Sequence, residues 1–186
     1  MPGPVFIDGE HVSLRTVEEE DIDFLQAQVN DPRIRRPIGR SRPLNRPQEQ
    51  EFFENVVCDD ETVHLLVAVE SSPDPVGMVG LDPIHLESRR AEIGYWVAPD
   101  AQAQGYGTEA VRLLVGYGFG QLGLHRVGAR VFDFNEPSAR LLERVGFSHE
   151  GTVRDEVFVD GTYHDTHWYG LLEGEWRAGD EPVETG

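Results

Sequence analysis

The sequence is poor in cysteine and contains no lysine. Cys58 is the one cysteine among 186 residues, which excludes an intramolecular disulfide framework and a zinc site held by several cysteines. A single thiol fits a reducing compartment. No apolar run approaches the roughly 20 residues that cross a bilayer, and the first ten residues lack the basic start and apolar stretch of a signal peptide. These absences predict a cytoplasmic protein without a membrane partner.

Positive charge is also scarce. The chain has 34 acidic and 16 basic residues, a formal net charge of −18, and every basic residue is arginine. A surface this negative opposes unspecific binding to nucleic acid, because neutralising phosphates requires cationic side chains. An excess of Asp and Glu keeps a protein soluble when salt screens charge, so a salt-adapted host is the preferred interpretation. The alternative is a GC-rich genome, in which arginine codons displace lysine codons.

The length and hydrophobic patterning predict one mixed α/β domain over residues 1–176, followed by an acidic, disordered tail over residues 177–186. In the first helix, Ile22, Leu25 and Val29 recur at helical spacing and should face the core. Periodicity predicts strands over 10–17, 62–70, 75–84, 91–99, 125–134, 153–160 and 163–173, and helices over 18–31, 47–58, 107–123 and 136–145.

The most informative segment is a glycine-containing loop between the strand over 91–99 and the helix that follows. Glycines at 105 and 107 allow backbone N–H groups to approach an anion, and the helix start adds partial positive charge, so a phosphate or pyrophosphate is the natural ligand. The alternative is a strand–helix turn without a ligand. Gly105-x-Gly107-x-x-Ala110 also fits a dinucleotide fingerprint, but residues 99–104 separate it from the strand and Asp133 lies too far along the chain for the ribose.

Three segments together resemble the GNAT superfamily of acetyl-CoA-dependent N-acetyltransferases, in its ribosomal-protein N-terminal acetyltransferase branch. Residues 102–107, Gln-Ala-Gln-Gly-Tyr-Gly, match that superfamily's Gln/Arg-x-x-Gly-x-Gly/Ala loop in full. The surrounding residues 91–110, then 132–147 and 160–172, continue the likeness, which covers roughly 10–175 in element order. That branch acetylates protein N-termini, and its relatives acetylate amino-sugars or other small amines.

The resemblance implies a fold and a co-substrate. The expected fold is a bent, mixed, mostly antiparallel sheet with a parallel central pair, flanked by helices. Acetyl-CoA would enter where the strand over 91–97 splays from its parallel neighbour, with pantetheine beside the backbone of Trp96 and Val97. The residues implied to contact the rest of the cofactor are Gln102, Ala103, Gln104, Gly105, Tyr106, Gly107, Thr108, Asn135 and Ser138.

Ser138 and Glu92 are the candidate catalytic residues. By resemblance, Ser138 hydrogen-bonds the CoA sulfur and acts as general acid; its alternative role is structural, at the start of a helix that Asn135 caps. A carboxylate at Glu92 beside Trp96 could have a raised pKa and accept a proton through water, unless it is simply a solvated strand charge. Glu156 is a second candidate base, and a water relay without any side-chain base is also open.

Two further clusters have structural alternatives. His164 and His167 lie three apart on a predicted strand and therefore point to opposite faces, which is wrong for joint metal ligation, so no metal is expected. Six arginines fall within residues 33–46. They could bind acceptor carboxylates or CoA phosphates, although pairing with the surplus acids is favoured. The six are Arg33, Arg35, Arg36, Arg40, Arg42 and Arg46.

The predicted activity is acetyl transfer from acetyl-CoA to a primary amine by direct attack in a ternary complex. The acceptor is a small-molecule or peptide amine, with a ribosomal protein N-terminus among the candidates, and the protein is expected to be a monomer or homodimer. One alternative is a CoA-binding GNAT module without catalysis. A weaker one is an NAD-binding oxidoreductase that uses the glycine loop.

Overall fold

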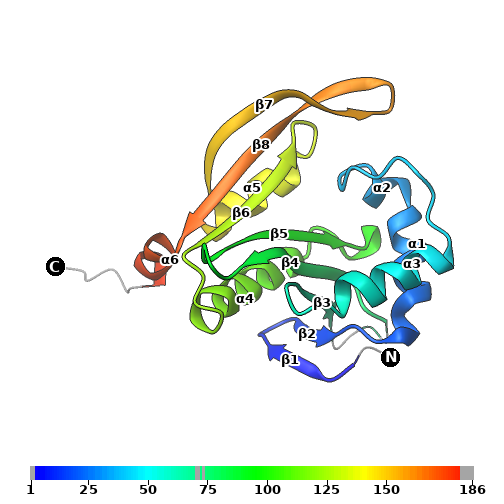
Figure 1. Cartoon of the computed structure of the whole chain (residues 1–186), viewed down its shortest axis with the longest axis horizontal. Coiled ribbons are helices and arrows are strands. Elements are labelled where there is room, and N and C mark those ends of the chain that lie inside the picture. Colours follow the sequence, from blue (N-terminus) through cyan, green and yellow to red (C-terminus); the bar gives the residue numbers. More distant parts are fainter. Residues whose placement is uncertain (1–2, 70–71, 73, 181–186) are drawn as a thin grey trace.

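The computed structural model describes residues 3–69, 72 and 74–180. Within these residues, eight strands form one sheet in the order β1-β2-β3-β4-β5-β6-β8-β7. β5 and β6 are parallel, and the other neighbouring pairs are antiparallel. This confirms the predicted mixed, mostly antiparallel sheet with one parallel pair (Figure 1). The strands are β1 (Val5–Asp8), β2 (Ser13–Thr16), β3 (Val63–Ala68), β4 (Gly77–His85), β5 (Arg90–Val97), β6 (Arg126–Phe132), β7 (Ser148–Val159) and β8 (Thr162–Leu172).

The helices flank this sheet as expected. Ile22, Leu25 and Val29 are buried on the first of them, which confirms the predicted periodicity. The helices are α1 (Ile22–Asn30), α2 (Pro32–Arg35), α3 (Arg46–Phe52), α4 (Tyr106–Gly120), α5 (Glu136–Val145) and α6 (Glu173–Asp180). Two short 3-10 helices, η1 (Glu19–Asp21) and η3 (Pro99–Ala101), and a π-helix that extends α3, η2 (Phe53–Val57), complete the list.

The predicted tail begins inside a helix. α6 continues to Asp180, so residues 177–180 extend the element that follows β8. The remaining tail residues, 181–186, lie outside the described part of the chain. No helix within the described residues combines the length and apolar character needed to cross a membrane.

The two faces of the sheet are covered by different helices. Alternate residues of a strand point to opposite faces. On one side Val79 and Ile93 join a large core with residues of α4 and α5, and we call this the α4 face. On the other side Leu66, Met78 and Trp96 pack with residues of α1, α3 and η2, and we call this the α1 face.

The parallel pair at the centre of the sheet separates after a short contact. β5 and β6 are in register only from Arg90–Glu92, opposite residues 126–128, whereas β5 stays paired with β4 as far as Val97. From their common start the two strands diverge, β6 rising with the long β7–β8 hairpin (Figure 1). Residues 93–97 therefore have a free edge on the β6 side, and we call the space between these strands the β5–β6 opening. This is the splay that the resemblance predicted.

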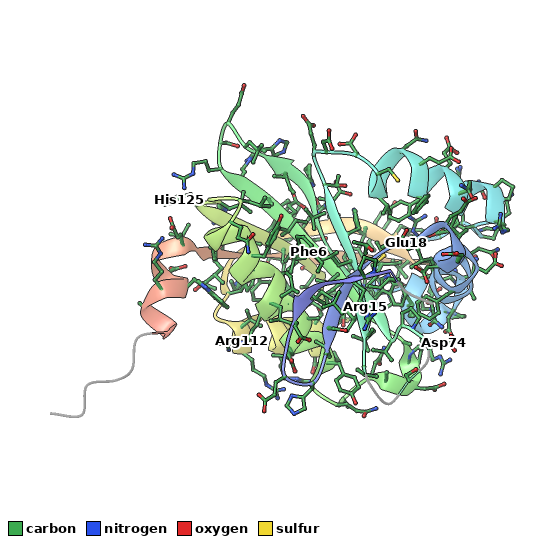
Figure 2. The ribbon with its side chains drawn as sticks, turned by 90° about the horizontal axis from the view of Figure 1, so that it is seen from below. Phe6, Arg15, Glu18, Asp74, Arg112 and His125 are labelled. Atoms are coloured by element: carbon green, nitrogen blue, oxygen red, sulfur yellow. The ribbon has the colours of Figure 1, made fainter. Side chains whose placement is uncertain are left out.

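The N-terminal hairpin, which sequence patterning anticipated only in part, braces the α4 face. Figure 2 labels Phe6 on β1 and Arg15 on β2. Phe6 packs edge-to-face on Tyr117 of α4, with ring centroids 5.2 Å apart. This contact joins the hairpin to the last turn of α4.

Candidate active site

The glycine loop has the backbone geometry of an anion site. Gly105 is the N-cap of α4 with φ of 89°, in the left-handed region that favours glycine, and Ala103 also has a positive φ of 61°. A Cβ built on Gly105 would meet no atom within 4 Å, so the space above it is open. The first N–H groups of this fifteen-residue helix have no partner within the helix and carry its positive dipole end. This geometry is compatible with a bound phosphate, and phosphate binding by the loop stays a prediction.

Contacts on both sides attach this loop to the β5–β6 opening. The side-chain amide of Gln102 donates to the carbonyl oxygen of Val97, at the end of β5, over 2.9 Å. Gly107 lies so close to its neighbours that an added Cβ would be 3.2 Å from both Val97 Cγ2 and Leu141 Cδ1 of α5. The loop, the end of β5 and α5 thus meet at one place, where a cofactor that spans loop and opening would lie.

Ser138 lies beside the opening, at the start of α5. The Asn135 side chain accepts a hydrogen bond from the Ser138 N–H, so the predicted helix cap is confirmed. The Ser138 hydroxyl is 2.7 Å from the hydroxyl of Tyr95, on the segment of β5 that has no β6 partner. Burial raises the pKa of Tyr95 to about 12, against the opposing effect of the hydrogen bond with Ser138. Tyr95 therefore keeps its proton at neutral pH and can hold the serine hydroxyl in place.

Sequence reasoning did not identify Tyr95. Strand alternation puts Tyr95 on the face opposite Trp96, but nothing in the local sequence indicates that the first turn of α5 lies over it. The two residues are 43 positions apart. The one available signal was that Tyr95 and Val97 share a face beside the predicted opening.

Glu92 has a partner that the sequence did not reveal. It lies on the α1 face with Trp96, as alternation predicted, and its Oε2 accepts from Arg130 Nε of β6 over 3.0 Å. The Arg130 guanidinium also lies 5.4 Å from the centroid of the Trp168 ring. Glu92 thus forms an ion pair with Arg130 across the start of the β5–β6 opening, and it is not an unpaired carboxylate beside Trp96.

The second candidate base and the two histidines lie on the long hairpin. Glu156 is exposed in β7, within a register shift between Val153 and Val157. His164 Nδ1 is 2.9 Å from Asp133, whereas His167 Nδ1 is 2.9 Å from Thr152. The histidines therefore have separate partners, in agreement with their predicted opposite directions.

Three of the six clustered arginines form ion pairs with nearby acids. Arg33 pairs with Asp31 at 2.7 Å, and Arg46 pairs with Asp23 at 2.8 Å. Arg36 reaches Asp160 at the tip of the β7–β8 hairpin, also at 2.7 Å. The favoured interpretation, pairing with surplus acids, holds for these three. The Arg36 contact also places the arginine segment against the hairpin tip.

A cavity of about 250 Å³ lies next to the start of α5. It lies between the start of α5 and strands β6 and β8, and Ser138 and Tyr95 are not among its lining residues. Asn135 is the one residue that it shares with the predicted site. Its lining is Phe132, Asp133, Asn135, Glu136, Ala139, Arg140, His167 and Tyr169.

The topology decides between the two interpretations of the glycine loop. A dinucleotide-binding fold needs an open, mostly parallel sheet, and here one pair of strands is parallel in the described sheet. The fold therefore contradicts the NAD-dependent alternative. It agrees with the arrangement that the acetyltransferase resemblance predicted.

Comparison with known proteins gives the same result. A protein named "Putative ribosomal N-acetyltransferase" from Bacillus subtilis (strain 168) is 32% identical over 176 residues, covering 91% of this chain and 95% of that protein. The spermidine N(1)-acetyltransferase of Escherichia coli (strain K12) is 29% identical over 167 residues, covering 90% and 89%.

A solved structure supports the fold. The spermidine N-acetyltransferase of Vibrio cholerae, in complex with CoA and spermine, has a TM-score of 0.85 over 91% of this chain and 99% of its own, at 24% identity. Residues 11–148 match the family model described as "Acetyltransferase (GNAT) domain". Because that match covers most of the chain, the protein belongs to the GNAT family of acetyltransferases.

Proposed function

We propose that this enzyme transfers the acetyl group of acetyl-CoA to a primary amine, and that the N-terminal amine of a protein is its acceptor class. The observation that carries the proposal is the β5–β6 opening with a phosphate-suited glycine loop at one end and Ser138 beside it. The similarity to the relative named as a ribosomal N-acetyltransferase supports a protein acceptor. Because another relative is a spermidine acetyltransferase, a polyamine is the alternative acceptor to test beside it.

The cofactor would lie along groups that the chain already positions. Backbone N–H groups of the loop, residues 102–108, would hold the pyrophosphate at the start of α4. By resemblance, pantetheine would lie beside Trp96 and Val97 as a further strand along the free edge of β5, where β6 does not pair and the Val97 carbonyl oxygen accepts from Gln102. Asn135 and Ser138 would then face the sulfur end from α5.

Chemistry in such a site requires two proton movements. The acceptor must lose one proton to expose its lone pair, and after nitrogen attacks the carbonyl carbon a second proton must reach sulfur as the C–S bond breaks. The Ser138 hydroxyl, held by Tyr95, is placed to donate to that sulfur. A thiol with an ordinary pKa near 8.5 is a good leaving group, so this assistance is modest. Glu92 and Glu156 stay predictions for the base.

The test is acetyl transfer measured by mass spectrometry in about 1 M potassium chloride, where salt screens the self-repulsion of the acidic chain. The probe amines are a short peptide with a free α-amino group, the same peptide with a blocked N-terminus, and spermidine. We expect a mass increase of one acetyl group on the free peptide and none on the blocked one. Saturable binding of acetyl-CoA without transfer to either free amine would instead identify a CoA-binding module without catalysis.

A further inference from the structure

On the α1 face, three residues from three strands form one row across the sheet. His64 of β3 is directly opposite Gly80 of β4, and Gly80 is directly opposite Gly94 of β5. They point to the same side as the neighbouring row of Leu66, Met78 and Trp96, because each row is offset from the other by two residues. The row therefore leads from His64 to the free edge of β5.

The space above the two glycines of this row differs: it is filled at Gly80 and open at Gly94. A Cβ on Gly80 would lie 2.5 Å from His64 Nδ1 and 2.8 Å from Cε1, so the imidazole lies over β4 in the space that a side chain would fill. A Cβ on Gly94 would meet no atom within 4 Å, so the space over β5 is open. The row thus offers an imidazole next to an open position at the edge of the β5–β6 opening.

The surroundings of His64 keep its imidazole neutral. Its side chain is 10% exposed, and it packs edge-to-face against Phe52 of α3. Burial lowers the pKa of His64, and the charge of Asp82, whose Oδ2 is 3.6 Å from Nε2, acts in the opposite direction. Because the net pKa is lowered, the ring is free to accept a proton at neutral pH.

Two other carboxylates lie on the elements around this row. Glu92 of β5 already binds Arg130. Glu49 of α3, one turn before Phe52, is itself buried, and burial raises its pKa, which favours its neutral form. Asp82 of β4 is thus the charge that acts directly on His64.

We propose that His64 is the general base of acetyl transfer and that Asp82 is its positioning residue. Neighbouring strands are about 4.8 Å apart, so an amine over Gly94 would be about 5 Å from a ring over Gly80, a span that one bridging water fills. The ammonium gives one proton through this water to His64. The nitrogen then attacks the carbonyl carbon, the C–S bond breaks, and the second proton of the nitrogen reaches sulfur through Ser138.

The assignment rests on the proposed function, and a pH profile tests it. We would measure kcat/KM for the free peptide and for spermidine with the wild type and with His64→Gln. The wild type should lose activity as pH falls through the pKa of His64. His64→Gln should be roughly 100-fold slower at pH 7, within the usual range for a general base, and should recover as pH approaches the pKa of the amine.

Two controls separate chemistry from structure. His85→Gln replaces an exposed histidine of the same strand as Gly80 and should leave the profile unchanged. Acetyl-CoA affinity, measured by calorimetry, should be the same in all variants. A recovery at high pH is a response that a purely structural role of His64 would not give.

Asp82→Asn provides a second, independent variant if His64→Gln does not fold. Asp82 raises the pKa of His64, so its removal should lower that pKa and shift the acidic limb to lower pH. The ring resonances of His64, followed by NMR against pH, should shift by the same amount without reference to turnover.

The outcomes distinguish the two proposals. If the wild type acetylates the free peptide and neither His64→Gln nor Asp82→Asn changes the profile, the base assignment is wrong while the proposed function stands. If the wild type acetylates neither amine, the proposed function fails and the base assignment fails with it.

Discussion

The two faces of β5 are built in different ways, although the proposed reaction uses both. On the α4 face, the groups proposed to hold the cofactor come from a contiguous loop, residues 102–108, and from one helix cap at Asn135. On the α1 face, His64, Gly80 and Gly94 meet only because three strands pair in one register. A short stretch of sequence can therefore specify a backbone site for phosphate, whereas a side-chain site for an amine depends on how the strands pair.

The largest effect should come from filling the close contact on the α4 face. At Gly107 an added Cβ would lie 3.2 Å from Val97 and Leu141, so Gly107→Glu adds bulk and a negative charge next to the proposed phosphate site. We expect acetyl-CoA binding, measured by calorimetry, to be lost. Gly120→Glu is the matched control, because it makes the same change in the same helix, where a Cβ meets nothing within 4 Å. Equal loss in both variants would contradict the loop assignment.

Gly94→Ala should affect the amine site on the α1 face without affecting the cofactor site on the α4 face. The added methyl group occupies open space, so the fold and the affinity for acetyl-CoA should be retained. It would displace an amine bound there, and a displacement of about 1 Å can cost up to roughly 100-fold in rate. Steady-state kinetics should show a lower kcat/KM for the amine. Unchanged kinetics would remove Gly94 from the acceptor path.

An effect no larger than this is expected on the α4 face, at the Tyr95–Ser138 pair. Ser138→Ala removes the proposed donor to sulfur and should lower kcat by about 100-fold at most, the low end for a general acid, because the thiol leaves readily. Tyr95→Phe removes only the group that orients the serine and should reduce kcat less. A larger loss for Tyr95→Phe than for Ser138→Ala would reverse the roles given to the two hydroxyls.

The smallest effect concerns stability and comes from Glu49 on the α1 face. Glu49 is 2% exposed, its Oε2 has no hydrogen-bond partner among the described residues, and burial, opposed by Arg40, raises its pKa from 4.5. The folded state therefore holds this proton more tightly than the unfolded state, and stability falls as pH rises from 4.5 through the raised pKa.

Glu49→Gln cannot ionise, so its stability relative to the wild type should increase across that pH window and be constant above it. Denaturant unfolding at several pH values would measure the difference. A difference that does not change with pH would show that Glu49 does not titrate as its burial implies.

The sequence predicted the α4 face better than the α1 face. The predicted helix cap at Asn135 is confirmed, and the left-handed glycines at 105, before α4, and at 146, after α5, follow from equally local rules. β1 and α2 were missed; each has four residues and, unlike the equally short β2, lies outside every predicted strand or helix. The Arg130 partner of Glu92 and the row at His64 depend on strand register, which single-strand patterns do not contain.

The most direct test of the central claim is amide hydrogen exchange with and without CoA. The claim is that pantetheine pairs with the free edge of β5 while the pyrophosphate lies on the glycine loop. We expect saturating CoA to slow exchange within Ile93–Val97 and Gly105–Thr108, and to leave β3, which lies across the sheet, unchanged. Unchanged exchange at both segments with CoA bound would contradict this placement of the cofactor.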